Sequence, residues 1–356
     1  MMKVLHVIYS LEVGGAQRLI TDLLPELSNY GVSPAVLVNR RQNNEFEKKL
    51  EDNGIPIISV NTNNNYSIFI LYMLLKQTRQ FDVVHVHLFP ALYILAFVRL
   101  FRNVRLVYTE HNTTNRRRNK TFLKRIERFV YHRYDSVVSV SDDTRNELCK
   151  WLGVSILEER FKVVKNGIDL NSFRIKKNKS PYPVTLLMIS RFAEAKDQPT
   201  VIKALTHLNE NIHVVFIGDG QRKIECEQLA NSLGVTERVH FMGCQSDIPS
   251  FISKADIGIL STHWEGLPLT IIEMMAGGIP VVASDVDGVR QIVKGAGLLF
   301  PEGDEIALAE AITQLSTNKI YYNEIRERCL SRSSEYDIKT TAQEYNNIYC
   351  QLFKTT

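Results

Sequence analysis

The strongest constraint on the fold is a regular alternation of two kinds of segment. Short runs rich in Val, Ile and Leu, such as residues 82–88 (DVVHVHL), are separated by longer stretches whose apolar residues recur every three or four positions. The first pattern predicts strands buried on both faces, and the second predicts amphipathic helices. Strands that alternate with helices form parallel sheets covered by helices on both sides. We therefore expect an α/β protein.

The alternation occurs twice, which predicts two domains. Seven strand-like runs precede the polar, basic and proline-containing segment 172–183, and six follow it. Such a composition is typical of a linker, and 356 residues suffice for two domains. We expect an N-terminal domain at 1–171, a C-terminal domain at 184–335, and a C-terminal helix at 336–356 that crosses back to the N-terminal domain.

The cysteines and the apolar runs argue against several classes of protein. The five cysteines show no CxxC and no Cys/His ligand spacing, so neither a disulfide framework nor a zinc site is predicted and a reducing cytoplasm fits best. The N-terminus has no cleavage site and is typical of a first strand rather than a signal peptide. The longest apolar run, 88–101, is too short to span a bilayer and contains Arg99.

The segment 269–276 (LTIIEMMA) places one carboxylate in an almost wholly apolar stretch. Pro268 suits the first position of a helix and a glycine pair follows the segment, so we predict a short buried helix. A buried carboxylate is costly unless it is paired. Glu273 therefore either has a structural role, in an ion pair or a cap, or receives two hydroxyls of a ligand docked at the helix start, where the amides of Leu269 and Thr270 could meet a phosphate.

Two cations follow the first strand of the second half. Arg191 comes just past the strand-like run 184–190, and Lys196 lies five residues further on. Open α/β sheets bind ligands at this carboxyl edge, and two cations there match a diphosphate. An Arg and a Lys in a loop are also commonly solvated without a ligand, so the pair alone leaves both alternatives open.

Two further candidates follow strands of the first half. Gly14 and Gly15 allow a close approach of the backbone to a ligand. They do not complete a GxGxxG motif, so we infer no NAD site. His111 follows the run 104–110, again at a carboxyl edge, where a histidine is either structural or catalytic.

Two motifs are interpreted as loops. Asp285 and Asp287 form a DxD, which can hold a divalent metal against a nucleotide diphosphate, but no third ligand is evident. Residues 218–220 (GDG) lack the third glycine of a phosphate loop and are expected to form a turn. We expect no metal and no cofactor.

Several motifs in one order resemble a known family. VGGAQR, TEHN, VKNGIDLNSF, ISRFAEAKD, and EGLPLTIIE followed by AGGIPVVAS are together similar to the retaining glycosyltransferases of family 4. The resemblance implies the GT-B architecture, with two Rossmann-like doubly wound parallel-sheet domains facing a central cleft. It also implies that the N-terminal domain binds the acceptor and that the C-terminal domain binds a nucleotide-sugar.

The resemblance also implies a role for each candidate residue. Glu273 matches the glutamate that holds the ribose hydroxyls, and Glu265 the one that contacts the donor sugar. Arg191 and Lys196 match the pair that neutralises the diphosphate. Gly15, beside Gly14, matches an amide near that group, and His111 matches the histidine beside the transferred sugar.

The chain departs from the family pattern after IPVVAS. The stretch SDVDGVRQIV places Asp287 where the family commonly has its first glycine and Gln291 where it has a glutamate. The family's loop lies near the donor sugar, so this difference bears on the identity of the donor.

The positive charge is concentrated in 116–133. This segment holds eight Lys or Arg and one Glu, a charge of +7, so the rest of the chain carries about −3 of the net +4. A helix here would place Phe122, Ile126, Phe129 and Val130 on one face. It is either a core-packed helix with a solvated face or a contact to an anionic membrane; without a recognition motif we do not expect nucleic acid. The cations expected at this acceptor or membrane surface are Arg116, Arg117, Arg118, Lys120, Lys124, Arg125 and Arg128.

Together these features predict a cytoplasmic, metal-independent, retaining hexosyltransferase that rests on the inner face of the membrane. It would move a sugar from a nucleotide-sugar, expected to be UDP-linked, to a glycan or lipid-linked acceptor in polysaccharide or glycoconjugate synthesis. The alternatives are a sugar-nucleotide epimerase of the same architecture and a non-catalytic nucleotide-sugar binding protein.

Overall fold

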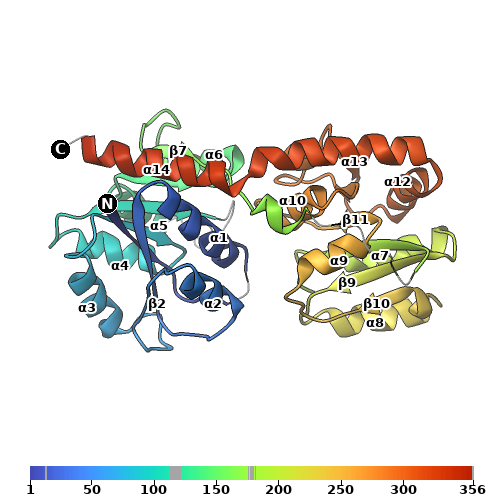
Figure 1. Ribbon diagram of the computed structural model, residues 1–356, viewed down its shortest axis with the longest axis horizontal. Helices are drawn as coiled ribbons and strands as arrows, with labels where there is room; N and C mark the ends of the chain where they lie inside the picture. The colour runs from blue at the N-terminus through green and yellow to red at the C-terminus, as the bar shows by residue number, and fades with distance from the viewer. Residues whose placement is uncertain (13, 112–121, 175, 177–179, 181, 355–356) are drawn as a thin grey trace. The chain divides into compact units, whose positions relative to one another are not determined.

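The computed structural model describes residues 1–12, 14–111, 122–174, 176, 180 and 182–354 (Figure 1). The chain forms two compact units, one from Met1–Gly167 with Ile338–Thr356 and the other from Ile168–Asp337. Each unit contains one parallel sheet with covering helices. The expected α/β class, with two Rossmann-like doubly wound domains, is confirmed.

The first unit contains a seven-stranded sheet with the order β3-β2-β1-β4-β5-β6-β7. All neighbouring strands are parallel, and the order reverses between β1 and β4, where open sheets bind ligands. The strands are β1 Met2–Val7, β2 Val32–Val38, β3 Ile57–Ser59, β4 Val83–His87, β5 Arg105–Glu110, β6 Ser136–Ser139 and β7 Phe161–Val163. The helices are α1 Gly15–Asn29, α2 Glu45–Asp52, α3 Ile68–Gln77, α4 Ala91–Val98, α5 Leu123–Tyr131, α6 Asp142–Leu152 and α14 Ile338–Lys354.

The second unit repeats this plan with six parallel strands in the order β10-β9-β8-β11-β12-β13. Here the order reverses between β8 and β11. The strands are β8 Val184–Ile189, β9 Ile212–Ile217, β10 Val239–Phe241, β11 Ile257–Leu260, β12 Val281–Ser284 and β13 Leu298–Phe300. The helices are α7 Gln198–Ala204, α8 Lys223–Ser232, α9 Ile248–Lys254, α10 Leu269–Ala276, α11 Arg290–Val293, α12 Glu305–Thr317 and α13 Lys319–Ser333.

The first crossing between the units lies earlier than the expected start of the linker. The first unit ends at Gly167 rather than at residue 171, because Ile168, Leu170 and Phe173 are buried in the core of the second unit. The polar composition of 172–183 predicted a linker, but Phe173 within it and Ile168 and Leu170 before it are core residues.

The C-terminal helix α14 belongs to the first unit, although it directly follows the helices of the second. It packs against α1, and its buried residues Ile338, Ala342 and Tyr345 join the core formed by β1 and α1. Figure 1 shows α14 in red over the blue elements of this unit. The first unit is therefore built from both ends of the chain.

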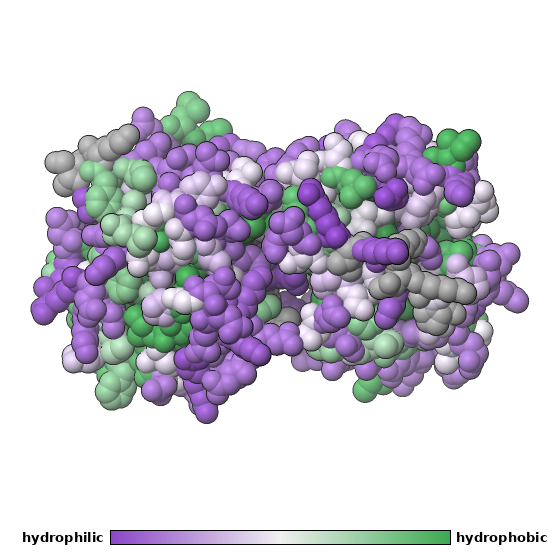
Figure 2. Space-filling view, in the orientation of Figure 1, coloured by the Kyte–Doolittle hydropathy of each residue, from purple (hydrophilic) through white to green (hydrophobic). Residues whose placement is uncertain are grey.

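The face that Figure 2 shows is largely polar. Hydrophilic residues predominate on each unit there, and smaller hydrophobic areas are scattered among them. Among the described helices, none has both the length and the apolar character that crossing a membrane requires.

Candidate active site

The loops after β8 and β11 are joined at the carboxyl edge of the second sheet. Lys196 and Thr262 form an antiparallel bridge. The amide of Asp197 donates to the carbonyl of Ser261 at 3.1 Å, and the amide of His263 donates to the carbonyl of Ala195 at 2.9 Å. Because β8 and β11 flank the reversal of strand order, these bonds fix two loops at the point where a ligand is expected.

Glycines let two further loops pack against this pair. Gly220 has a positive φ of 152°, and a Cβ there would overlap the carbonyl oxygen of Phe192. Gly288 has φ 81°, and a Cβ there would overlap the carbonyl oxygens of Glu265 and Gly266. The GDG segment directly follows β9, and its last glycine lies against the backbone of Phe192, beside Arg191. The SDVDG loop, in which the chain departs from the family pattern, contacts Glu265 through Gly288.

Lys196 forms an ion pair with Glu265. The side chains are 17% and 18% exposed, so the pair is mostly buried but still reaches the surface. Burial and the nearby Arg191 guanidinium lower the pKa of Lys196 to about 8. The Glu265 carboxylate acts in the opposite direction, because an anion favours the protonated amine. The structure therefore brings Arg191, Lys196 and Glu265 together, as two cations and one carboxylate.

The helix α10 begins and ends where the sequence predicts, at Leu269 and Ala276. Pro268 is the residue before the first helical position rather than the first position itself. Glu273 is 2% exposed and takes part in an interaction within the protein. In the described part of the chain, no acceptor contacts the amides of Leu269 or Thr270. These amides are available to an anion.

Both aspartates of the DxD motif form ion pairs with one arginine. The Arg290 guanidinium bonds the Asp285 carboxylate at 2.6 Å and the Asp287 carboxylate at 3.0 Å. Both aspartates are therefore paired rather than merely solvated. A metal held by both carboxylates would compete with Arg290 for them.

In the first unit, the strand-to-helix turn after β1 presents Gly14 and Gly15. Gly14 is extended, with φ −178°, and Gly15 is the first residue of α1. A Cβ on Gly15 would meet no atom within 4 Å, and the first turn of this 15-residue helix contains no acidic residue. Among the described residues the Gln17 side chain lies against Gly14, and the amide end of α1 suits a negatively charged group.

His111 directly follows β5 and is half-buried. Its Nε2 lies 3.2 Å from Nδ1 of His87. Burial lowers the pKa of His111 to about 4, so the ring is neutral at physiological pH. The sequence prediction did not include this bond. The HVH spacing on β4 was the signal, because it places two histidines on one face of a strand.

The basic segment is described from Phe122 onwards, so Arg116, Arg117, Arg118 and Lys120 lie outside the described residues. The expected face of α5 is divided. Val130 is buried, whereas Phe122, Ile126 and Phe129 are 69%, 47% and 53% exposed. Glu127, Val130 and Tyr131 form the buried face instead, because residues three and four apart share one side of a helix.

The cations of α5 lie near this exposed apolar stripe. Arg125 and Arg128 are exposed and Lys124 is half-buried. The Arg133 guanidinium lies 4.5 Å from the centre of the Phe129 ring. The exposed face of α5 is thus both apolar and cationic.

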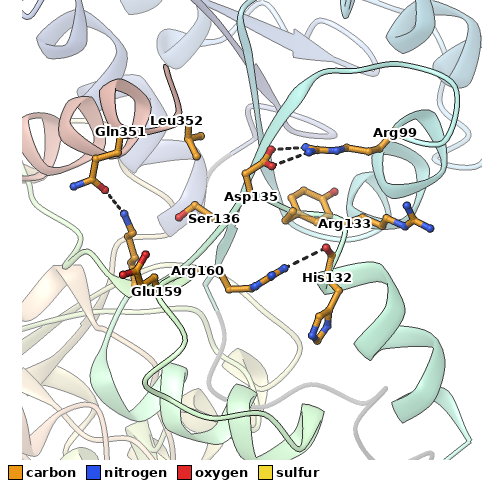
Figure 3. Close-up of a pocket in the computed structure, with 11 residues that line it drawn as sticks. Arg99, His132, Arg133, Asp135, Ser136, Glu159, Arg160, Gln351 and Leu352 are labelled. Atoms are coloured by element: carbon orange, nitrogen blue, oxygen red, sulfur yellow. Dashed lines mark hydrogen bonds and ion pairs between the residues drawn. The ribbon is translucent and has the colours of Figure 1, made fainter. Parts of the chain in front are cut away.

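A pocket of about 460 Å³ lies at the opposite, amino edge of the first sheet (Figure 3). Its cations are largely engaged within the protein. Arg99 bonds the Asp135 carboxylate at 2.7 Å, and Arg160 bonds the carbonyl of His132 at 3.2 Å. Lys162 bonds the side chain of Gln351. None of the predicted site residues lines this pocket, so we do not assign the reaction to it.

Two family models match adjoining parts of the chain. Glycosyltransferase Family 4 matches residues 13–172, and Glycosyl transferases group 1 matches residues 171–332. The chain belongs to the group 1 glycosyltransferases of family 4. The suspected family is therefore confirmed, and the protein is a glycosyltransferase.

Relatives of this glycosyltransferase act on several substrates. A UDP-Gal:alpha-D-GlcNAc-diphosphoundecaprenol alpha-1,3-galactosyltransferase from Escherichia coli is 24% identical over 277 residues, which are 71% of each chain. A phosphatidyl-myo-inositol mannosyltransferase from Mycobacterium leprae is 26% identical over 286 residues, which are 76% of this chain and 73% of that protein. Anabaena HepE, solved in complex with UDP and glucose, has a TM-score of 0.86 and 21% identity, and the match covers 99% of this chain and 100% of HepE. The last comparison shows the fold alone.

Proposed function

We propose that this glycosyltransferase moves a hexose from a UDP-sugar to a lipid-linked or glycan acceptor, with retention of anomeric configuration and without a metal. The observation that carries the proposal is the group of Arg191, Lys196 and Glu265 at the carboxyl edge of the second sheet. Support for UDP comes from HepE, solved with UDP, and from the galactosyltransferase named for UDP-Gal.

The first task of such a site is to stabilise the leaving group. When the anomeric bond breaks, negative charge accumulates on the nucleoside diphosphate, and fixed cations and oriented amides lower the energy of that charge. We assign this role to Arg191 and Lys196, assisted by the free amides of Leu269 and Thr270. Gly15, beside Gly14, would contribute a further amide from the start of α1.

The second task is to orient the sugar and the ribose. We assign the ribose hydroxyls to Glu273, whose buried carboxylate suits two hydroxyl donors. We assign a sugar hydroxyl to Glu265, which would exchange part of its contact with Lys196 for the ligand. His111, neutral and fixed by His87, would contact the transferred sugar. None of these groups is assigned as a nucleophile.

The proposal that the reaction needs no metal rests on the ion pairs between Arg290 and the two aspartates of the DxD motif. Arg290 forms ion pairs with both Asp285 and Asp287, so these carboxylates would attract a cation to the diphosphate less strongly. Lys196 and Arg191 would supply the positive charge that a divalent ion supplies elsewhere.

The acceptor is proposed to reach the protein from an anionic membrane on the cytoplasmic side. The helix α4 packs against both α3 and α5, and Figure 1 shows α3 and α4 at the left of the first unit. These helices expose large apolar side chains, including Ile68 at 70% and Phe69 at 65% on α3 and Phe129 at 53% on α5, and α5 also carries the exposed cations Arg125 and Arg128. Apolar area together with cations is what binds a peripheral protein to anionic lipid.

Vesicle sedimentation tests the membrane contact. The wild type should sediment with vesicles that contain phosphatidylglycerol and remain in solution with neutral vesicles. A variant with Ser at Phe122, Ile126 and Phe129 should lose this binding at an unchanged melting temperature. Equal binding of variant and wild type would refute the contact.

A panel of nucleotide-sugars tests the reaction. The cognate donor at one hundred times its dissociation constant should stabilise the protein by about 2.7 kcal/mol, a shift that a thermal melt detects. That donor should then be consumed only when a lipid-linked or glycan acceptor is added. Conversion of the donor alone would favour the epimerase, and donor binding without turnover would favour the non-catalytic binding protein. Proton NMR of the product's anomeric centre distinguishes retention from inversion.

A further inference from the structure

A group of buried histidines lies beneath His111 in the first unit. His6 on β1 pairs in register with His85 on β4, and His87 lies two residues further along β4. Residues two apart on a strand project from the same face, so the three side chains share one layer. All three are fully buried, at the point where the strand order reverses between β1 and β4.

Two hydrogen bonds join three of the histidines into a chain. Nδ1 of His6 lies 3.0 Å from Nε2 of His87, and Nδ1 of His87 lies 3.2 Å from Nε2 of His111. Both ring nitrogens of His87 are thereby used. At the far end, Nε2 of His6 is buried and meets no partner among the described residues. The chain leads from the core to the residue assigned to the sugar.

His85 stands beside the chain and does not belong to it. Its ring nitrogens lie 2.6 Å from the Tyr349 hydroxyl and 2.7 Å from the Thr109 hydroxyl. Nitrogen atoms of His6, His85 and His87 lie within 4.8 Å of one another, which raises the question of a metal. However, His85 offers no unused nitrogen, and the His6 and His87 rings are nearly parallel, at 14°. Rings in this arrangement do not direct lone pairs to one ion, as tetrahedral ligation requires.

The three linked rings are neutral at physiological pH. Burial lowers the pKa of His6 to about 3 and that of His111 to about 4. Burial, with the neighbouring histidines, holds the pKa of His87 well below its usual range. A neutral imidazole has one N–H and one lone pair. The chain therefore has only two arrangements, with every bond donated towards His111 or every bond donated towards His6.

We propose that His6 donates to His87 and His87 donates to His111, so that His87 is a positioning residue that fixes the proton of His111 on Nδ1. The opposite arrangement would leave an unpaired N–H on Nε2 of His6, and buried N–H groups without a partner are rare. In the proposed arrangement His111 offers an N–H donor to an oxygen of the transferred sugar. This last step rests on the proposed function, whereas the tautomer does not.

Nitrogen NMR of the full chain with ¹⁵N-labelled histidine tests the tautomer without any substrate. The His111 signals, assigned by their loss in a His111→Asn variant, should show a protonated Nδ1 and an unprotonated Nε2 at neutral pH. In His87→Leu the two tautomers should exchange and their shifts should average. A protonated Nε2 in the wild type, or an unchanged spectrum in His87→Leu, would overturn the proposal. One bound transition metal per chain in the purified protein would overturn it too.

Kinetics then tests what the positioning achieves. His87→Leu should lower kcat on the order of 10- to 100-fold, as misplacement of a reacting group does, with little change in the KM of the donor. His87→Asn should recover most of this loss, because its side-chain nitrogen takes the place of Nδ1 and can donate to His111. His85→Asn, equally buried on the same strand, is the matched control and should keep kcat. Equal losses in His87→Asn and His87→Leu, at equal melting temperatures, would contradict the proposal. Absence of transfer by the wild type would refute the proposed function and leave the NMR result standing.

Discussion

Donor binding should weaken at alkaline pH because of Lys196. The free protein holds the pKa of this amine at about 8, and a bound diphosphate would raise it, since a nearby anion favours the charged form. Above pH 8 the amine must therefore take up a proton when the donor binds. The affinity for the donor is therefore highest below pH 8 and decreases progressively as the pH rises.

The magnitude follows from the fraction of protonated amine. Each pH unit above the pKa costs about 1.4 kcal/mol, or about tenfold. With a pKa of about 8, the dissociation constant of the UDP-sugar should be about tenfold larger at pH 9 than at pH 7. Calorimetry at both pH values measures it, and titration in buffers of different ionisation enthalpy should reveal proton uptake at pH 9.

The control is Lys196→Arg, because a guanidinium remains charged throughout this range. Its dissociation constant should change little between the two pH values, and titration of the ligand itself would act equally on both proteins. If the variant and the wild type show the same dependence on pH, the effect does not come from Lys196. If the wild type shows none, the assignment of this amine to the diphosphate is wrong.

Three further changes probe the same site. Gly288→Ala should destabilise the protein by about 1–3 kcal/mol in urea unfolding, because φ is 81° and the new Cβ would overlap the carbonyl of Glu265. Glu273→Gln should weaken UDP binding about tenfold by calorimetry, since a charged acceptor of hydroxyls becomes neutral; an unchanged affinity would remove the ribose assignment. Arg290→Ala should free Asp285 and Asp287, so manganese should then bind more tightly than to the wild type, and equal binding would contradict the account of the DxD.

Much of the fold could be predicted because buried parallel strands are continuous apolar runs. The run 82–88 contains β4, and 269–276 coincides with α10. The bounds of these elements follow from the local sequence, and their bounds in the folded protein agree with the prediction. The carboxyl-edge positions of Arg191 and His111 followed directly from the strand predictions.

The pairings between distant residues could not be predicted in the same way. The bond between His6 and His87 depends on the register of β1 against β4, which no local pattern specifies. The buried side of α5 could not be predicted for a different reason. Phe129 and Val130 are both apolar and were placed on one face, but adjacent residues lie about 100° apart around a helix, and packing buries Val130 and leaves Phe129 exposed.

The placement of α14 has a consequence for synthesis of the protein. Five buried residues of α14 complete a core whose other buried members come from the first 164 residues: Ile338, Ala342, Tyr345, Ile348 and Tyr349. While the ribosome is still translating the second unit, α14 has not been made, so the apolar face of α1 that packs against it is still exposed to solvent. The first unit must stay in a partly folded form until its last helix emerges, so a chain truncated after Asp337 should be bound by chaperones or degraded.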